Sequence, residues 1–543
     1  MAISRRKFML STLAGSAVAM VGGAELVSGL TSSASAASPA GDVVGKITVG
    51  YQGWFACKGD GAPINGWWHW SQNMASAPST SNTNIKAWPD MADYTATYKT
   101  AFANFNNGQP ATLFSSYDQQ TVNTHFSWMQ QNGCDTAALQ RFNPTGGEGP
   151  TRDAMAAKVK SAAEAYGRKF YIMYDVSGWT TMQADIKADW TNKMSAYTSS
   201  SAYARQSGKP VVCIWGFGFN DSNHTWDAAT CLDVVNWFKN QGCYVIGGVP
   251  THWRTSSDDS RAGFLDVYHA FNMLSPWMVG RIGSVADTNN FYTNVNTPDM
   301  ADCKANGIDY QPCVLPGDLS ANQRAHGDFM WAQFYNMVRV GAQGIYISMF
   351  DEYGEGNQIG KTSASQATVP AGSGLLALDE DGTACSTDYY LRLTNDGGKM
   401  LKGQIALTST RPTPPIPSTT TPSPSPTATA GCGMLTADQN FVVNKPLLSC
   451  DGRFKLVLGG DGNLVLYQGG TVLWSAKTSG KGATQAYMQG DGNFVLYTAA
   501  GSPVWSSGTA GNNGATLSVQ DDGNVVIASS AGKSLWTTGT AGH

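Results

Sequence analysis

Charged side chains are scarce in this sequence. Asp, Glu, Lys and Arg make up only 14% of the 543 residues, and the formal net charge is -4, whereas about a quarter of the residues are charged in ordinary globular proteins. No basic run follows the first few residues, which argues against nucleic acid as a partner. No apolar stretch beyond the N-terminus has the length that a membrane span needs.

Metal and cofactor motifs are missing too. The 10 cysteines form no CxxC pair, no histidines stand at zinc-ligand spacing, and no nucleotide or flavin motif occurs. We therefore expect no metal and no obligatory cofactor. An even number of dispersed cysteines favours disulfides made in an oxidising compartment.

Aromatic side chains are plentiful, at 11% of the chain with 17 Trp. Flat rings stack on the apolar faces of pyranoses, so few charges and many aromatics suit a protein that handles neutral sugars. A large Trp-rich core explains the same composition equally well. The length predicts two to four domains.

The N-terminus has the order of features of a bacterial export signal. A twin-arginine pattern at 4–8 precedes an apolar stretch, Leu10 to Gly23, and then Ala34-Ser35-Ala36 as a cleavage site. We expect residues 1–36 to be removed and the protein to be secreted. The alternative is a chance Arg pair before an uncleaved anchor.

Residues 409–430 are almost wholly Ser, Thr, Pro and Ala. Such a segment buries too little apolar surface to fold, and it predicts an extended linker. The linker would separate a domain at 38–408 from a smaller one at 431–543.

The smaller domain contains a threefold repeat. Segments beginning at Gly459, Gln489 and Gln520 share an Asp-Gly-Asn core, and their Asp positions lie 30 and 31 residues apart. In the second segment Gln, Asp, Asn, Val and Tyr occupy alternate positions, which on a strand point to one face. They would offer hydrogen-bonding groups around one apolar contact, as a sugar ring requires. A plain turn explains one Asp-Gly-Asn copy equally well.

This pattern resembles the bulb-type mannose-binding lectins, over roughly Leu435 to Thr540. The resemblance implies an all-β β-prism of three four-stranded sheets, with Trp residues in its centre and a mannose site on each sheet. It assigns the complete site to the second segment and weaker sites to the others, because Gly459 replaces Gln and Ala528 replaces Tyr. The implied mannose-binding residues are Gln489, Asp491, Asn493, Val495, Tyr497, Asp461, Asn463, Tyr467, Gln520, Asp522 and Asn524. We also expect Cys432 and Cys450, the two cysteines of this domain, to pair.

The larger domain alternates apolar runs with helix-like segments between Lys46 and Phe350, which predicts an α/β (β/α)8 barrel. Nine runs are candidate strands, one more than a barrel needs, and Ala111 to Ser116 is expected to lie outside it. The other eight are Ile47 to Gln52, Thr136 to Gln140, Lys169 to Asp175, Pro210 to Trp215, Tyr244 to Gly247, Ala270 to Leu274, Tyr310 to Leu315 and Gly344 to Met349. Polar and aromatic residues follow these strands, where barrels carry their sites. The candidate substrate-binding residues are Trp54, His69, Trp70, Asp175, Trp215, Trp253, Arg254 and Tyr353.

Three acidic residues, Asp351, Glu352 and Glu355, follow the last candidate strand within five positions. Carboxylates beside a buried strand are costly unless they are paired or functional. Glycoside hydrolysis usually needs two carboxyl groups. Glu352 and Glu355 are therefore the candidate catalytic pair; a surface loop is the alternative.

This region, about 46–361, resembles glycoside hydrolase families 71 and 99, and family 99 endo-α-mannosidases most closely. Their Asn-Glu-Trp-x-Glu-Gly motif stands here as 351–356, with Asp351 for Asn and Tyr353 for Trp. The resemblance implies retaining cleavage within an α-mannoside chain. Glu352 would be the base on the sugar's own 2-hydroxyl, and Glu355 would protonate the leaving oxygen.

The sequence thus predicts a secreted, monomeric glycoside hydrolase of α-mannan-type polysaccharide with a mannose-binding lectin domain. Two alternatives stay open. One is an α-1,3-glucanase or arabinan-type hydrolase on the same scaffold, and the other is a binding protein without activity.

Overall fold

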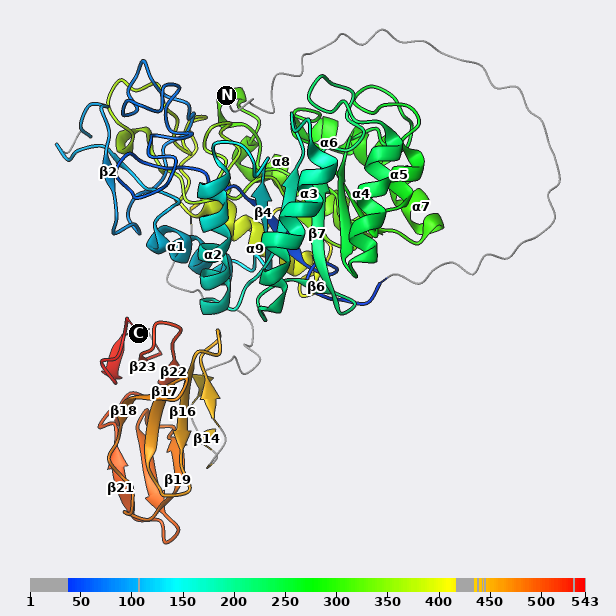
Figure 1. Ribbon diagram of the computed structural model, residues 1–543. Helices are drawn as coiled ribbons and strands as arrows, with labels where there is room; N and C mark the ends of the chain where they lie inside the picture. Colours follow the sequence, from blue (N-terminus) through cyan, green and yellow to red (C-terminus); the bar gives the residue numbers. More distant parts are fainter. Residues whose placement is uncertain are drawn as a thin grey trace, which may run out of the picture. The chain divides into compact units, whose positions relative to one another are not determined.

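The computed structural model describes residues 38–105, 108–416, 434–436, 439–441, 443, 446–530 and 533–542. The chain divides into two compact units, Met1–Ser418 and Thr419–His543, and each is described by itself (Figure 1). The predicted export signal and most of the predicted linker lie outside the described residues.

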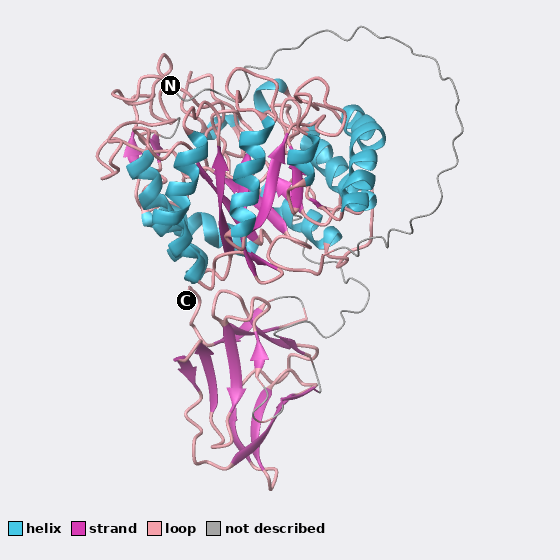
Figure 2. Cartoon of the chain, turned by 45° about the vertical axis from the view of Figure 1, so that its right-hand side comes forward, coloured by secondary structure: helices cyan, strands magenta, loops and turns pink. Residues whose placement is uncertain are grey.

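The first unit is built on a parallel sheet with helices around it (Figure 2). Neighbouring strands follow the order β10-β9-β8-β7-β5-β4-β1-β12-β11. The strands are β1 (Ile47–Tyr51), β4 (Thr136–Arg141), β5 (Lys169–Asp175), β7 (Lys209–Trp215), β8 (Tyr244–Val249), β9 (Met273–Pro276), β10 (Asp309–Tyr310), β11 (Cys313–Val314) and β12 (Ile345–Ile347).

The two end strands of this sheet are consecutive in the chain. β10 pairs with β9 at one end and β11 with β12 at the other, and only Gln311 and Pro312 separate them. The curled parallel sheet with its helices is consistent with a TIM-like barrel, which is the fold class that the sequence predicts. Its interior is filled: a Cβ added to Gly50 would lie 2.2 Å from the Tyr346 hydroxyl oxygen and 2.5 Å from Met349 Sδ.

Helices follow the strands in the order expected for βα units. They are α1 (Gln119–Gln131), α2 (Gly149–Ala165), α3 (Met182–Asp189), α4 (Ala228–Asn240), α5 (Leu265–His269), α6 (Val285–Phe291), α7 (Thr297–Asn306), α8 (Asp328–Val340) and α9 (Tyr389–Leu401). Local signals set their ends: the Asp227 side chain caps α4 by accepting from Thr230 N, and α7 ends at Gly307 with φ 67°.

Three short strands lie outside the parallel order. β6 (Arg205–Gln206) pairs antiparallel with β7, and β2 (Tyr98–Lys99) forms a hairpin with β3 (Thr112–Leu113). The run Ala111 to Ser116 therefore contributes only β3, as the sequence predicts. The long segment between β1 and α1 contributes Trp54, Phe55, His69 and residues 83–86 to the pocket described below.

The eight described cysteines of the first unit are buried and form no disulfide with one another, which corrects the expectation of disulfides there. Cys57 illustrates why: its thiol donates to the Phe114 carbonyl oxygen at 3.3 Å, and burial raises its pKa well above the usual value. These cysteines pack as small apolar residues. Cys450 is disulfide-bonded; its predicted partner Cys432 lies outside the described residues, so that pairing stays a prediction.

Residues beyond the predicted end of the first domain still contact it. Arg411 Nε donates to Asp328 Oδ1 at 2.7 Å, and Thr413 Oγ1 donates to Asp396 Oδ2 at 2.7 Å. The first residues of the Pro-rich segment thus pack on α8 and α9, and the boundary between the units falls at Ser418.

The second unit contains three antiparallel four-stranded sheets, ordered β13-β22-β23-β24, β14-β19-β20-β21 and β15-β16-β17-β18. Each joins one early strand to the three strands of one repeat. The strands are β13 (Met434–Leu435), β14 (Gln439–Phe441), β15 (Leu447–Leu448), β16 (Phe454–Leu458), β17 (Leu464–Gln468), β18 (Thr471–Ser475), β19 (Ala483–Met488), β20 (Phe494–Thr498), β21 (Pro503–Ser506), β22 (Thr516–Val519), β23 (Val525–Ala528) and β24 (Ser534–Thr537).

One Trp from each repeat meets the other two. Ring centroids lie 6.0 Å apart for Trp474 and Trp505, 5.5 Å for Trp474 and Trp536, and 5.6 Å for Trp505 and Trp536, all edge to face. The repeated apolar-Trp pair thus supplies the contact that joins the three sheets.

Candidate active site

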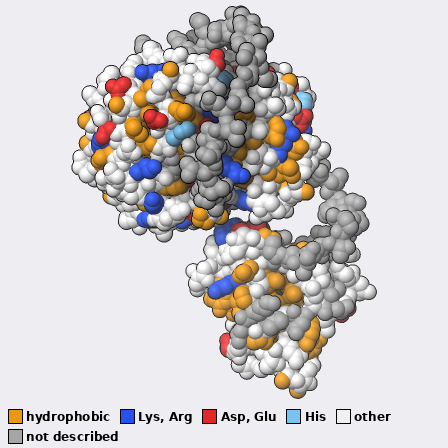
Figure 3. Space-filling view, turned by 90° about the vertical axis from the view of Figure 1, so that its right-hand side faces the viewer, with side chains coloured by type: hydrophobic (Ala, Val, Ile, Leu, Met, Phe, Trp, Pro, Cys, Tyr) orange, Lys and Arg blue, Asp and Glu red, His pale blue; other side chains and the backbone are white. Residues whose placement is uncertain are grey.

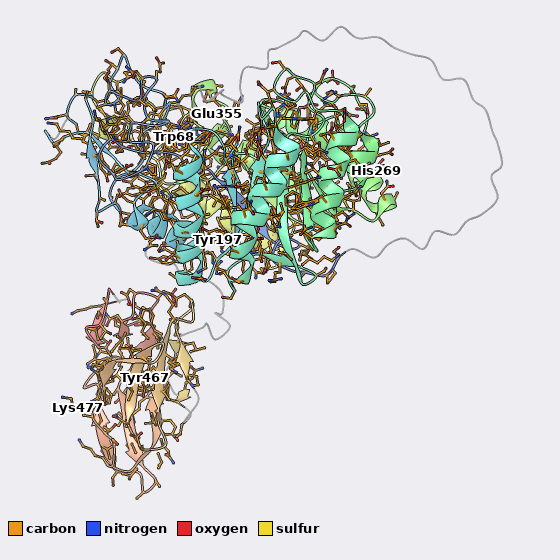
Figure 4. The ribbon with its side chains drawn as sticks, in the orientation of Figure 1. Trp68, Tyr197, His269, Glu355, Tyr467 and Lys477 are labelled. Carbon is orange, nitrogen blue, oxygen red and sulfur yellow. The ribbon has the colours of Figure 1, made fainter. Side chains whose placement is uncertain are left out.

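A pocket of about 360 Å³ opens beyond the carboxyl ends of four neighbouring strands, β5, β4, β1 and β12. Glu355 and Trp68 lie at this end of the unit, and Tyr197 lies toward the opposite end (Figure 4). The pocket is lined by Trp54, Phe55, His69, Thr83, Asn84, Ile85, Lys86, Phe142, Asp175, Ser177, Glu352, Gly354 and Glu355.

Both candidate catalytic carboxyl groups line this pocket while being largely buried. Glu352 is 4% exposed and Glu355 is 8% exposed. Glu352 Oε2 accepts from Gln52 Nε2 at 3.2 Å, and its Oε1 accepts from Gly354 N at 3.1 Å. Two donors directed at one carboxylate stabilise its ionised form. Gly354 permits this approach, because a Cβ there would lie 3.0 Å from Glu352 Oε1.

The third acid, Asp351, joins two strand ends instead of facing the pocket. Its two carboxylate oxygens accept from the backbone N–H groups of Gln52 and Gly53, each at 2.8 Å. Burial raises the pKa of Asp351 to about 6, although those two backbone donors act in the other direction. Asp351 therefore positions the loop after β12 against the loop after β1.

Aromatic rings form one wall of the pocket. The ring of Trp54 stacks on His69, with centroids 3.7 Å apart and planes at 13°, and it also lies 5.8 Å from Phe142 at 18°. Burial, and then the charge of Arg152, lower the pKa of His69 well below its usual value, so this ring is neutral. A flat neutral face of this kind suits the apolar side of a sugar ring.

The guanidinium group of Arg152 supports that wall from behind. It lies 4.7 Å from the ring of Phe142, 4.9 Å from Trp68 and 5.7 Å from Trp54. Its Nη1 donates to the Gln52 carbonyl oxygen at 2.7 Å. Cation–π contact and this hydrogen bond fix the rings relative to the carboxylate loop.

Five residues expected to bind substrate do not line the pocket. Trp70, Trp253 and Tyr353 are fully buried, and their polar atoms donate to Phe114 O, Asp299 Oδ2 and Lys361 O. The structure therefore places these three in the core.

Trp215 and Arg254 lie elsewhere. Trp215 is 5% exposed and packs against Phe219 and Trp277. The guanidinium of Arg254 donates to Asp299 Oδ1 at 3.1 Å. Among the predicted residues, the pocket thus brings together Trp54, His69, Asp175, Glu352 and Glu355.

Sequence reasoning missed one whole stretch of the pocket, 83–86. These residues belong to the irregular segment between β1 and α1, where no periodicity or motif marks them. Lys86 is held there by donating to Ser320 Oγ at 2.8 Å. Phe55, Phe142 and Ser177 follow predicted strands, so their positions after those strands were the available signal.

In the second unit, a shallow pocket of about 430 Å³ lies at the second repeat, the one with the complete motif. It is lined by Tyr487, Met488, Gln489, Gly490 and Asp491. Gln489 Nε2 donates to Tyr497 Oη at 2.8 Å, so two motif side chains lie together on one face.

The Asp-Gly-Asn core also builds the turn. Asp491 Oδ1 accepts from Asn493 N at 3.0 Å, and Asn493 Oδ1 accepts from Thr509 N at 3.1 Å and Ser507 Oγ at 3.1 Å. Within the described ranges, no side chain or backbone group hydrogen-bonds Asp491 Oδ2 or Asn493 Nδ2. The same two residues can therefore shape the turn and present groups to a ligand.

The other two repeats keep the turn and differ at the motif ends. Asp461 and Asp522 accept from Asn463 N and Asn524 N in the same way. At Gly459 a Cβ would lie 2.6 Å from Asp461 Oδ1, so the Gln of the motif would fit the first repeat only if the Asp461 side chain shifted. Tyr467 packs under Lys455 Nζ at 5.4 Å. In the second repeat, Val495 is buried. In the third repeat, Gln520 is exposed, and Ala528 stands where the motif has Tyr.

Within the described ranges, no group of three or more His, Cys, Asp or Glu is placed to hold a metal ion. Over the same residues, no helix has the length and apolar character of a membrane span. Lys, Arg, Asp and Glu are scattered over the visible face instead of gathering by sign (Figure 3).

Comparison with known proteins gives structural likenesses only. No family model matches the chain, and no curated protein matches it. A GH99 endo-α-mannosidase from Bacteroides thetaiotaomicron is 14% identical over 66% of this chain and 98% of its own, with a TM-score of 0.48. A Japanese Marasmius oreades lectin is 33% identical over 20% of this chain and 92% of its own, with a TM-score of 0.20. The snowdrop (Galanthus nivalis) mannose-specific agglutinin is 34% identical over 20% and 96%, with a TM-score of 0.17.

Proposed function

We propose that the first unit is a retaining glycoside hydrolase that cleaves within α-mannan-type polysaccharide, and that the second unit binds mannose. The observation that carries the proposal is the pair Glu352 and Glu355. Both are more than nine-tenths buried, yet both line one pocket with an aromatic wall. Burying two acids that line one pocket is unfavourable, and a loop with a purely structural role would not require it.

The chemistry needs one base and one acid. Glu352, whose two oxygens accept hydrogen bonds, takes the proton from the sugar's 2-hydroxyl as that oxygen attacks C1. Glu355 gives its proton to the departing glycosidic oxygen. Glu355 then takes a proton from water, which opens the anhydro sugar at C1, and Glu352 returns the proton to the 2-oxygen. Two inversions at C1 retain the configuration.

Mannose as the sugar is supported by the second unit. Its complete motif coincides with a pocket, and tethering a binding module to an enzyme raises the local concentration of a shared substrate. We further propose that the unit is a β-prism and that the protein is secreted as a monomer after cleavage near residue 36.

Release of reducing ends from yeast α-mannan, α-1,3-glucan and arabinan distinguishes the candidate functions. We expect release from mannan by the wild type and by Glu164→Gln, an exposed control, and none by Glu355→Gln. Release from glucan or arabinan alone would support the other hydrolases. Equal inertness of wild type and Glu355→Gln on all three would support a binding protein.

A further inference from the structure

A chain of hydrogen bonds leads from the pocket into the protein behind it. Asp175, the last residue of β5, accepts at Oδ1 from Ser177 N at 3.0 Å and from Ser177 Oγ at 2.6 Å. Ser177 Oγ lies 3.0 Å from His224 Nε2. His224 Nδ1 lies 2.7 Å from Asp221 Oδ2. Asp175 and Ser177 line the pocket, so the chain connects a pocket wall to a histidine outside it.

The far end of this chain is buried and fixed. The side chains of His224 and Asp221 are 5% and 6% exposed. Burial pushes the pKa of Asp221 up, but the hydrogen bond and charge of His224 outweigh it and hold that pKa below its usual value. The loops after β5 and β7 are also joined by Gly178 N, which donates to the Asn223 carbonyl oxygen at 2.9 Å.

The groups around His224 are mostly apolar. Its ring packs against Trp215, Phe219 and Trp226. A Cβ at Gly216 would lie 2.9 Å from the ring. The charged and titratable groups that face His224 are Asp221, Asp175 through Ser177, and Arg261, whose Nη1 donates to the His224 carbonyl oxygen at 3.0 Å.

Serine, histidine and aspartate in this order resemble a nucleophilic triad, but the geometry does not favour an acyl-transfer site. The serine hydroxyl lies 2.6 Å from the carboxylate of Asp175. The N–H groups of Ser177, Gly178 and Trp179 already donate to Asp175, Asn223 and Val176. This turn therefore has no N–H donor left for an oxyanion, and Ser177 acts as a bridge.

The bridge allows two states with the same number of protons. In one, His224 is an imidazolium that donates to both Asp221 and Ser177, and Ser177 donates to an ionised Asp175. In the other, Asp175 carries the proton and donates to Ser177, which donates to a neutral His224. Moving one proton along the two bonds converts one state into the other, with no exchange with solvent and no change of net charge.

We propose that Asp175 is a third carboxyl group of the active site. Ser177, His224 and Asp221 are then positioning residues that determine whether Asp175 is ionised or protonated when it contacts a sugar hydroxyl. The proposal rests on the glycosidase function above. In both states Asp175 can accept a hydrogen bond from a pyranose hydroxyl in the pocket, and it accepts more strongly when it is ionised, while Glu352 and Glu355 carry out the bond cleavage.

The first test measures the pH dependence of kcat/KM on α-mannan. Ser177→Ala removes the bridging hydroxyl, and His224→Gln removes the titrating ring from the hydrogen-bond chain. Either substitution should lower kcat/KM about 10- to 100-fold and remove or shift one limb of the pH profile. The double variant should have a kcat/KM no lower than that of the more impaired single variant, because either substitution alone already interrupts the hydrogen-bond chain. His252→Gln, which removes a His–Asp pair outside the pocket, should keep the wild-type profile.

Three outcomes would overturn the proposal. They are unchanged profiles in Ser177→Ala and His224→Gln, multiplicative losses in the double variant, or labelling of Ser177 by a fluorophosphonate, which would make it a nucleophile. Thermal unfolding identifies variants that fail to fold.

A second test does not depend on hydrolysis. With ¹⁵N-labelled histidine, the chemical shifts of the two His224 ring nitrogens, which report where its protons lie, should change in Asp175→Asn at a fixed pH, because the carboxylate at the end of the hydrogen-bond chain is lost; those of His252 should not change. Unchanged His224 shifts contradict the proposed chain even in an active enzyme. Changed shifts in a protein inert on every glycan contradict the glycosidase function alone.

Discussion

At the scale of single residues, the account rests on two glutamates with different tasks. Glu352 accepts from Gln52 and Gly354, which suits a base, while Glu355 is assigned the proton donated to the leaving group. An acid is needed only when the leaving oxygen is a poor one, whereas the base on the 2-hydroxyl is needed for every substrate.

We therefore expect Glu355→Gln to lose at least about 1000-fold in kcat/KM on mannan and to recover most of it on an aryl α-mannoside with an acidic phenol. Glu352→Gln should be inactive on both. Initial rates with the two substrates test this, with Glu164→Gln as the matched control. Recovery of Glu352→Gln instead of Glu355→Gln would mean that the two roles are exchanged.

Single residues also mark the limit of sequence reasoning. Trp54 and Trp253 both follow predicted strands in aromatic surroundings, yet Trp54 lines the pocket and Trp253 is fully buried. The difference arises from what covers each ring, namely contacts between loops far apart in the sequence. No local pattern encodes those contacts.

At the scale of elements, Asp351 holds the site together. It joins the end of β12 to the end of β1, and it is completely buried. Asparagine at this position would offer an acceptor to only one of the two backbone N–H groups and would direct its own N–H at the other. We expect Asp351→Asn to lower the free energy of unfolding by about 1–3 kcal/mol at pH 7, measured by urea denaturation.

The sign of the pH dependence follows from the raised pKa of Asp351, about 6 against 3.8 for the ordinary group. The folded state holds this proton more tightly, so the stabilisation is complete below pH 3.8 and is lost as the pH rises through 6. The difference in unfolding free energy between wild type and Asp351→Asn should shrink over that window, by at most about 3 kcal/mol. If the difference in unfolding free energy instead grew as the pH rose, it would contradict a pKa of Asp351 that burial raises.

The positions of the parallel strands are the feature that the sequence predicts best. Parallel strands are buried on both faces and read as apolar runs, so β5 has the predicted bounds, and β1 and β7 differ from theirs by one residue. The sequence predicts one strand over Tyr310 to Leu315, but the structure splits this run into β10 and β11 around Gln311 and Pro312. Proline lacks the N–H that a continuous ladder needs.

At the scale of the whole molecule, two units are proposed to act on one polysaccharide. If the second repeat binds mannose, Asp491→Asn should weaken binding to mannan and slow hydrolysis of insoluble mannan severalfold, through lost local concentration. Hydrolysis of a soluble oligosaccharide should be unchanged.

Asp522→Asn provides the matched control for that prediction, because the third repeat keeps the turn but has Ala528 instead of the motif's Tyr. Pull-down on insoluble mannan, with kcat/KM on both substrates, measures the effect. Equal losses in the two variants, or a loss on the soluble substrate, would show that the second repeat has no special role.

The central claim is that one glycosidic bond lies between two carboxyl groups at the end of the parallel sheet. A crystal structure of Glu355→Gln soaked with an α-mannan oligosaccharide tests it most directly. The account predicts the glycosidic oxygen about 3 Å from the side chain at position 355 and the adjoining 2-hydroxyl at a similar distance from Glu352. A sugar bound away from both side chains, or with its reducing end between them and no glycosidic bond there, would contradict it.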